Sequence, residues 1–236
     1  GRDRAKLDLP GLQEELIRAV SGTGVPTVVV LINGSAVTMS SWLDRAAAVV
    51  EAWYPGEEGG NALADVIFGD YNPAGRLPIT FPLYVGQCPL YHNPKPTGRG
   101  YDYVDLSGKP LFPFGYGLSY TKFEYSNLRI TPAGIRPGEK VTVSVDVQNV
   151  GDRKGDEVVQ FYLHDVVSYP ARPLKELSGF RRITLEPREK RTVAFTLSAE
   201  QMSFLDINMK RVIEPGTFEV MIGSSSEDIR AKATFE

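Results

Sequence analysis

The side chains that could carry chemistry are few, and the carboxylates among them have simpler explanations. Glu57 and Glu58 form a pair of adjacent carboxylates, a residue type that general acid–base catalysis uses. They stand where a helix is predicted to begin, and the helix dipole favours negative charge at that end. Asp3 lies between Arg2 and Arg4, and an Asp–Arg pair that shapes the loop accounts for it. None of these carboxylates is assigned a catalytic role.

The two histidines and the single cysteine predict neither a metal site nor a redox site. His92 lies in an aromatic segment, where a ligand-facing residue and a packing histidine are the two interpretations. His164 follows a predicted strand and is interpreted as structural, and Cys88 has no recognisable base partner. One cysteine excludes an internal disulfide, and two histidines give no visible metal-ligand cluster. We therefore expect no metal and no cofactor.

Length and composition describe a globular chain without an evident nucleic-acid or membrane partner. The 236 residues are enough for one large or two ordinary domains, and 42% of them are hydrophobic. The formal net charge is −3, and neither half of the chain has a basic footprint. No apolar run approaches the roughly 20 residues of a membrane-spanning helix. The first residue is Gly1 rather than Met, so we expect the natural start to lie upstream.

Residues 1–82 have an α/β pattern. The run 26–32, PTVVVLI, is β-branched without alternation, as in a strand that is buried on both faces of a parallel sheet. Eighty residues make a small doubly covered sheet, so we expect the sheet to continue upstream. The predicted elements are a helix over 12–20, the strand over 26–32, a short helix capped by Ser40 or Ser41, a strand over 47–53, a helix that Gly69 ends, and a strand over 77–81.

The rest of the chain divides into a linker and an all-β domain. Residues 83–122 are rich in Pro, Gly and Tyr and have no clear periodicity, which indicates a linker strapped across a surface. Residues 123–236 contain strictly alternating runs such as 141–147, typical of half-buried antiparallel strands. About seven such strands predict a β-sandwich of the immunoglobulin or fibronectin III-like kind. The fold class is therefore α/β followed by all-β, with domains over 1–82 and 123–236.

Several motifs together resemble a known enzyme family. Trp53–Pro82 has the form W-x-P-G-x-E-G-G-x-A-x-A-x-x-x-F-G-D-x-N-P-x-G-R-L-P-x-T-F-P, which is similar to the end of the α/β-sandwich domain of family 3 glycoside hydrolases. These enzymes are the β-glucosidases and their relatives. The segment 99–102 resembles a shortened and altered family step. The further segments that resemble the family, including its fibronectin-like third domain, are 112–123, 175–180, 214–220 and 223–225.

The resemblance also implies where the chemistry lies. Family 3 enzymes are retaining glycosidases, which need a nucleophile and an acid/base carboxyl about 5–5.5 Å apart. The family nucleophile is an Asp on a barrel domain that nothing in this chain resembles. The acid/base is a Glu just before a segment similar to residues 1–13, so it is expected upstream of Gly1. The isolated chain is therefore predicted to be inactive and to line the cleft.

The resemblance suggests both partners and contacts. The implied partners are the N-terminal barrel, the remainder of the α/β domain, and a carbohydrate substrate, most commonly a β-glucoside. β-Xylosides, arabinosides and N-acetylglucosaminides are the other substrate classes of the family. The candidate substrate-binding residues are Asp3, Arg4, Tyr91, His92 and Tyr101.

Two alternatives to an enzyme fragment are open. One is a non-catalytic carbohydrate-binding module, in which the sandwich binds polysaccharide through an aromatic strip. The other is a structural fibronectin-like module. The aromatic residues of 123–236 mostly alternate inward and no Trp occurs there, which disfavours the first. The motif in Trp53–Pro82 disfavours the second, because an adhesion array has no need of it.

Overall fold

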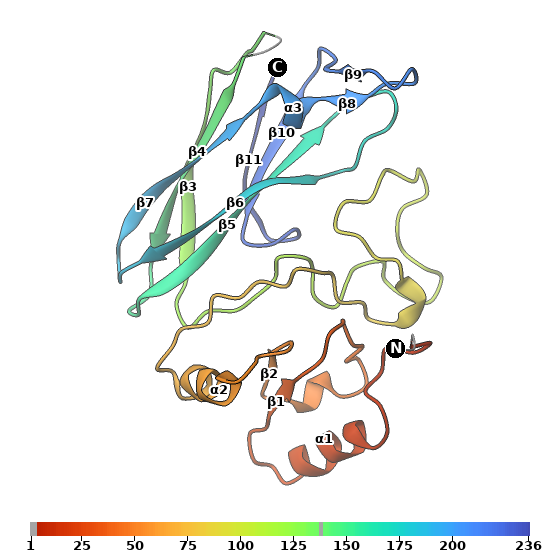
Figure 1. Ribbon diagram of the computed structural model, residues 1–236, viewed down its shortest axis with the longest axis vertical. Coiled ribbons are helices and arrows are strands. Elements are labelled where there is room, and N and C mark those ends of the chain that lie inside the picture. The colour runs from red at the N-terminus through yellow and green to blue at the C-terminus, as the bar shows by residue number, and fades with distance from the viewer. Residues whose placement is uncertain (1–3, 137–138) are drawn as a thin grey trace. The chain divides into compact units, whose positions relative to one another are not determined.

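The computed structural model describes residues 4–136 and 139–236, which divide into two compact units (Figure 1). The α/β unit comprises residues 4–71, 79–90 and 101–113. The sandwich unit comprises residues 72–78, 91–100 and 114–236. The predicted linker thus contributes to both units, and the domain boundaries drawn from sequence remain a prediction.

The α/β unit is built on a two-stranded parallel sheet. β1 pairs with β2 in parallel, with Val29 opposite Val49 and Leu31 opposite Glu51. This confirms the parallel α/β character that the β-branched runs predict. The elements of the unit are α1 (Gln13–Ser21), β1 (Val28–Leu31), the 3₁₀ helix η1 (Leu43–Arg45), β2 (Ala48–Glu51), α2 (Gly59–Phe68) and the 3₁₀ helix η2 (Val85–Gln87).

The end of α2 is as the sequence predicts, whereas the start of η1 is not. Gly69 ends α2 in the left-handed conformation, with φ of 87°, as its position in the sequence predicts. Ser40 and Ser41 do not cap η1, which begins after Trp42 without a side-chain cap. Their hydroxyls donate elsewhere, Ser40 to the Leu83 carbonyl and Ser41 to a carboxylate of α1. Longer-range acceptors therefore outcompete the local cap.

The strand predicted over 77–81 does not form. Phe81 makes an isolated antiparallel bridge with Phe112, and its ring meets Trp53 and Phe112 edge-on, at 6.2 and 6.4 Å between centroids. Pro78 lies within this segment and Pro82 follows it, and a proline cannot donate to a strand ladder. The apolar run therefore bends at residues 78–79 and forms no strand.

The sandwich unit has two antiparallel sheets, as predicted. One sheet has the order β11–β10–β5–β6 and the other β3–β4–β7, so the two contain seven strands among the described residues. A small hairpin, β8 (Phe204–Leu205) with β9 (Arg211–Val212), follows the short helix α3 (Ala199–Met202). The sheet strands are β3 (Phe123–Thr131), β4 (Val141–Asn149), β5 (Gly155–Asp165), β6 (Glu176–Leu185), β7 (Lys190–Leu197), β10 (Phe218–Gly223) and β11 (Ile229–Phe235).

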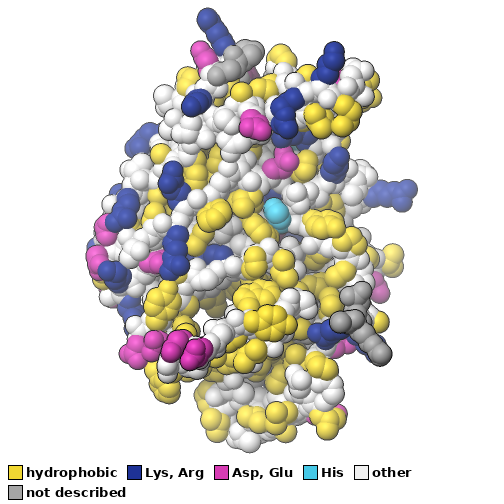
Figure 2. Space-filling model, in the orientation of Figure 1, with side chains coloured by type: hydrophobic (Ala, Val, Ile, Leu, Met, Phe, Trp, Pro, Cys, Tyr) yellow, Lys and Arg dark blue, Asp and Glu magenta, His cyan; other side chains and the backbone are white. Residues whose placement is uncertain are grey.

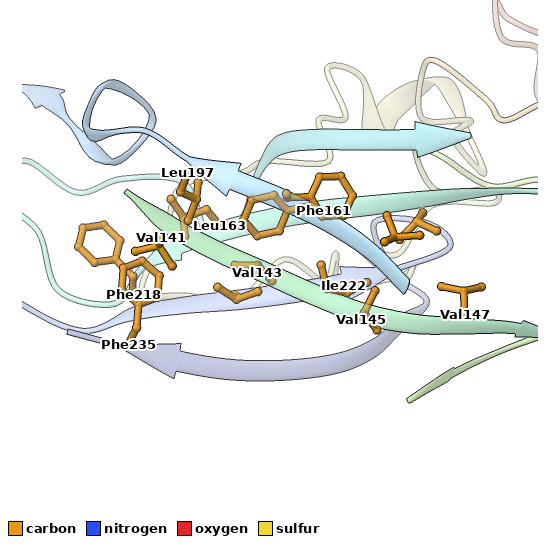
Figure 3. Close-up of a cluster of buried hydrophobic side chains, with 14 of the residues drawn as sticks. Val141, Val143, Val145, Val147, Phe161, Leu163, Leu197, Phe218, Ile222 and Phe235 are labelled. Carbon is orange, nitrogen blue, oxygen red and sulfur yellow. The ribbon is translucent and has the colours of Figure 1, made fainter. Parts of the chain in front are cut away.

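The core of the sandwich lies between the two sheets (Figure 3). The alternating valines of β4, from Val141 to Val147, are fully buried there, which confirms the period-two pattern. Aromatic rings fill the same layer, with Phe161 stacked on Phe195 at 5.2 Å and Phe218 near Phe235 at 5.4 Å. These four aromatic side chains therefore serve packing.

The charged side chains of the visible face are mixed in sign. Figure 2 shows Lys and Arg scattered among Asp and Glu rather than gathered in one basic patch. No helix within residues 4–136 and 139–236 combines the length and apolarity that spanning a membrane requires.

One ion pair interrupts the apolar packing of the sandwich unit. Glu157 of β5 accepts hydrogen bonds from Arg76, at 3.0 Å, and from the hydroxyl of Tyr125, at 2.9 Å. The side chains of Arg76 and Glu157 are only 9% and 3% exposed. Burial raises the pKa of Glu157, and the Arg76 guanidinium opposes that rise. This pair fastens the segment 72–78 to the strands of its unit.

We expect Glu157→Gln to destabilise the sandwich unit strongly. Removing one partner leaves Arg76 as a buried unpaired charge, which costs about 3–5 kcal/mol of unfolding free energy. The matched control is Glu219→Gln on β10. The side chains of Glu219 and its ion-pair partner Lys232 are 27% and 53% exposed, so losing this pair costs about 0–1 kcal/mol of unfolding free energy. Urea unfolding of both variants measures the difference, and equal losses would contradict a buried pair.

Candidate functional site

The N-terminal loop of the α/β unit positions Arg4. Arg4 is exposed and donates to the Asp8 carbonyl, while the Asp8 carboxylate accepts from the hydroxyl of buried Thr38 at 2.5 Å. The Thr38 amide also donates to the Leu7 carbonyl, at 3.0 Å. Two hydrogen bonds thus hold this loop beside the segment that follows β1. The other candidate here, Asp3, lies outside the described residues.

Sequence reasoning did not single out Glu51, a carboxylate at the carboxyl end of β2. Burial raises the pKa of Glu51, and its Oε1 accepts from the Trp53 amide at 3.1 Å. Trp53 has φ of 52°, a conformation that a bulky residue adopts only under constraint. The carboxyl ends of parallel strands are the usual place for ligands in such sheets. A carboxylate within the strand predicted over 47–53 was the available signal.

A buried glutamine orders the part of the linker that carries Tyr101. Gln87 is 2% exposed, and its Nε2 donates to the carbonyls of Ser107 and Lys109, each at 3.0 Å. The Asp102 carboxylate accepts from the Gly108 amide at 2.7 Å and closes the loop. Tyr101 is exposed on this loop. An exposed ring on an ordered loop is suited to contact a ligand.

Tyr91 and His92 belong to the sandwich unit and differ in exposure. Tyr91 is 67% exposed, whereas the imidazole of His92 stacks on Phe114 at 4.1 Å and meets Tyr162 edge-on at 6.3 Å. Burial lowers the pKa of His92, and the positive charge of Lys175 lowers it further. These are the contacts of a packing histidine, and a substrate role for His92 stays a prediction.

A hydrogen-bond network beside His92 connects β5 to the linker at Gly115 and to the loop between β10 and β11 at Ser224. Gln160 is 3% exposed, and its Nε2 donates to the carbonyls of Gly115, at 3.0 Å, and Ser224, at 2.6 Å. The Tyr162 hydroxyl donates to Oε1 of Gln160 at 2.6 Å. Every polar group of the Gln160 amide is thereby used in structure.

The sequence-based candidates therefore fall into two groups. Arg4 and Tyr101 lie in the α/β unit, and Tyr91 and His92 lie in the sandwich unit. Within the described residues, no group of three or more His, Cys, Asp and Glu side chains could hold a metal ion. The geometry offers exposed side chains on hydrogen-bonded loops rather than an assembled catalytic centre.

We expect His92 to make the sandwich unit sensitive to acid. Because its folded pKa is depressed below 6.5, the unfolded chain binds the proton more readily, so stability is present above pH 6.5 and is lost as pH falls through the folded pKa. His92→Phe keeps the ring packing and should flatten this dependence. Urea midpoints over a pH series measure it, and parallel curves for the two proteins would contradict the assignment.

Two family descriptions cover most of the chain. Residues 1–120 match the family described as "Glycosyl hydrolase family 3 C-terminal domain". Residues 157–226 match the "Fibronectin type III-like domain". The order of the two agrees with an α/β fold followed by a β-sandwich.

Curated relatives match the chain over nearly its whole length. It is 44% identical over 243 residues to the periplasmic β-glucosidase of Salmonella typhimurium, covering 99% of the chain and 32% of the relative. It is 45% identical over 232 residues to a β-xylosidase of Formosa agariphila, covering 96% of the chain and 32% of the relative. The chain spans about a third of the length of these relatives.

Solved structures agree with the sequence relatives. A β-glucosidase from Erythrobacter marinus superposes with a TM-score of 0.95 at 42% identity, over 100% of the chain and 31% of that structure. The β-glucosidase from Listeria innocua in complex with glucose superposes with a TM-score of 0.92 at 37% identity, over 99% of the chain and 34% of that structure. Since the first family match covers half of the chain and the relatives cover almost all of it, the chain belongs to glycosyl hydrolase family 3.

Proposed function

We propose that this chain forms the C-terminal part of a retaining β-glycosidase of the β-glucosidase type. It lines and braces the cleft, while the nucleophile and the acid/base are supplied by the remainder of the enzyme. The observation that carries the proposal is the 44% identity to a β-glucosidase over 99% of the chain, with only 32% of that relative matched. The substrate is then a terminal β-linked sugar of an oligosaccharide or glycoside.

Exposed apolar surface in the α/β unit supports the proposal that a partner covers this unit. Parallel sheets are normally covered on both faces, but β1 and β2 form a sheet of only two strands. α1 has no buried residue, and its side chain Leu16 is 64% exposed. Val28, the first residue of β1, and Ile32, which follows its last residue, are exposed as well. The remaining α/β domain and the barrel of the same enzyme are the partners that we propose for this surface.

We include Arg4 among the proposed substrate contacts because hydrogen bonds to Thr38 hold its loop in place. Tyr101 and Tyr91 are exposed rings on linker segments, which makes them suitable for contact with sugar rings. Asp3 and His92 complete the proposed set. The relatives include enzymes named β-glucosidase and β-xylosidase, so an aryl β-glucoside and an aryl β-xyloside are the two test substrates.

We expect the isolated 236-residue chain to hydrolyse neither aryl glycoside. Activity should appear when the chain is co-expressed with the part of the Erythrobacter marinus β-glucosidase that it does not match, because we expect that part to supply both carboxyl groups. Release of the aryl group measures the turnover. Turnover by the purified chain alone would overturn the placement of both carboxyls outside it. Strong retention of the sandwich on insoluble β-glucan, together with no restored turnover, would favour a binding module instead.

We expect Leu16→Glu to reduce the restored activity by about tenfold or more, because a charge would be buried without a partner at the proposed interface. Leu16 is exposed in the chain itself, so the thermal midpoint of the isolated variant should not fall. Glu15→Lys, on the polar side of α1, is the control and should change the restored activity little. Equal activities of the two variants would show that α1 does not face the partner.

A further inference from the structure

The sandwich unit contains a pocket that none of the predicted roles uses. Its volume of about 480 Å³ falls in the range of about 300–1,000 Å³ that is common for small-ligand sites. All of its lining residues belong to the sandwich unit. They come from Arg76, the segment 116–125, the loop between β4 and β5, β5, the loop that precedes β11, and β11 itself.

The inner wall of the pocket is polar and buried. It includes the buried pair of Arg76 and Glu157 together with Tyr125. Arg76 donates from Nη2 to Glu157 at 3.0 Å and from Nη1 to the Gly75 carbonyl at 3.1 Å, and a guanidinium carries five N–H groups. Its Nε has no partner among the described residues. The protein therefore leaves part of the hydrogen-bonding capacity of this wall unused.

The outer wall is an ion pair that solvent reaches. Arg230 donates from Nη2 to Oδ2 of Asp228 at 2.6 Å, and the Ser224 hydroxyl donates to the same oxygen at 2.7 Å. Asp228 and Arg230 are each a little under half exposed. These groups are oriented by one another, so a ligand would meet fixed donors and acceptors.

The charges of the pocket cancel. Its lining contains three cationic and three anionic side chains: Arg76, Lys122, Arg230, Glu124, Glu157 and Asp228. An anion would face the three carboxylates, and a cation would face the three basic groups. A neutral molecule that both donates and accepts hydrogen bonds satisfies both signs without burying a net charge.

The same pocket offers apolar surface to the carbon atoms of such a ligand. The rings of Tyr116 and Tyr125 and the side chain of Phe123 belong to its lining. Sugars present hydroxyl groups at their edges and C–H groups on their faces, which suits charged side chains beside aromatic ones. We propose that this pocket binds a neutral polyhydroxylated small molecule, a mono- or disaccharide.

This site does not depend on the proposed hydrolytic function, because the chain itself supplies every lining residue. The contrasting interpretation is that the Arg76–Glu157 pair only fastens segment 72–78 to the sandwich. Both interpretations require the pair for stability, so a variant of the pair cannot separate them. The rim residue Arg230 can, since it lies on the surface and its substitution leaves the inner pair intact.

Titration calorimetry and saturation-transfer NMR on the 236-residue chain, with glucose, xylose and cellobiose as probes, test the proposal. We expect saturable binding of at least one sugar, weakened about tenfold by Arg230→Gln, which removes a charged hydrogen-bond donor. The matched control is Lys232→Gln, two residues further along β11, where another exposed ion pair lies outside the pocket lining. It should bind as the unmodified chain does.

Inorganic phosphate in the same titration tests the charge argument. Binding of phosphate but of no sugar would overturn the proposal of a neutral ligand. Absence of saturable binding by all three sugars would overturn the site, and so would equal weakening by Arg230→Gln and Lys232→Gln. None of these results bears on restored hydrolysis, so the two proposals fail separately.

Discussion

The packing of two β-sheets against each other is the interaction on which the rest of the sandwich unit depends. The inward valines of β4 and Phe195 of the adjacent β7 meet Phe161 of the opposite sheet across the core, and this packed core gives the irregular segments a surface to lie on. Segments without periodicity, such as 91–100, have no core of their own. Segment 91–100 is held by contacts with its unit instead: His92 stacks on Phe114 and meets Tyr162 of β5 edge-on, and the Leu174 amide donates to the Pro94 carbonyl at 2.9 Å.

The α/β unit shows the opposite situation, in which secondary structure is present without enough surface to cover it. A parallel pair of strands supplies hydrogen bonds, but its stability depends on layers of helices on both faces. The helix α1 is regular, yet its apolar side chain Leu16 is exposed, as expected for a helix layer that is not covered. The family 3 relatives of this chain are about three times as long as the chain itself. Further segments of that length are consistent with a cover for the exposed apolar surface of the α/β unit.

Sequence reasoning was accurate where one periodicity or one special residue determines the structure. The alternation over 141–147 identified a strand with a buried face, and Gly69 identified a helix end. It was wrong for 77–81, where apolar composition suggested a strand that Pro78 within the segment and Pro82 after it prevent. Most of the polar sites escaped it, because the pairing of Arg76 with Glu157 joins residues 81 positions apart. No local pattern encodes such a contact.

The Arg76–Glu157 pair also affects how freely the fibronectin-like fold can be exchanged between proteins. Arg76 belongs to a segment far upstream of β3, yet it neutralises a charge inside the sandwich. A gene segment that began at β3 would carry the carboxylate without its counter-ion. Recombination that moves this sandwich is therefore tolerated only when the upstream segment travels with it, so the two parts of the chain are expected to be inherited together.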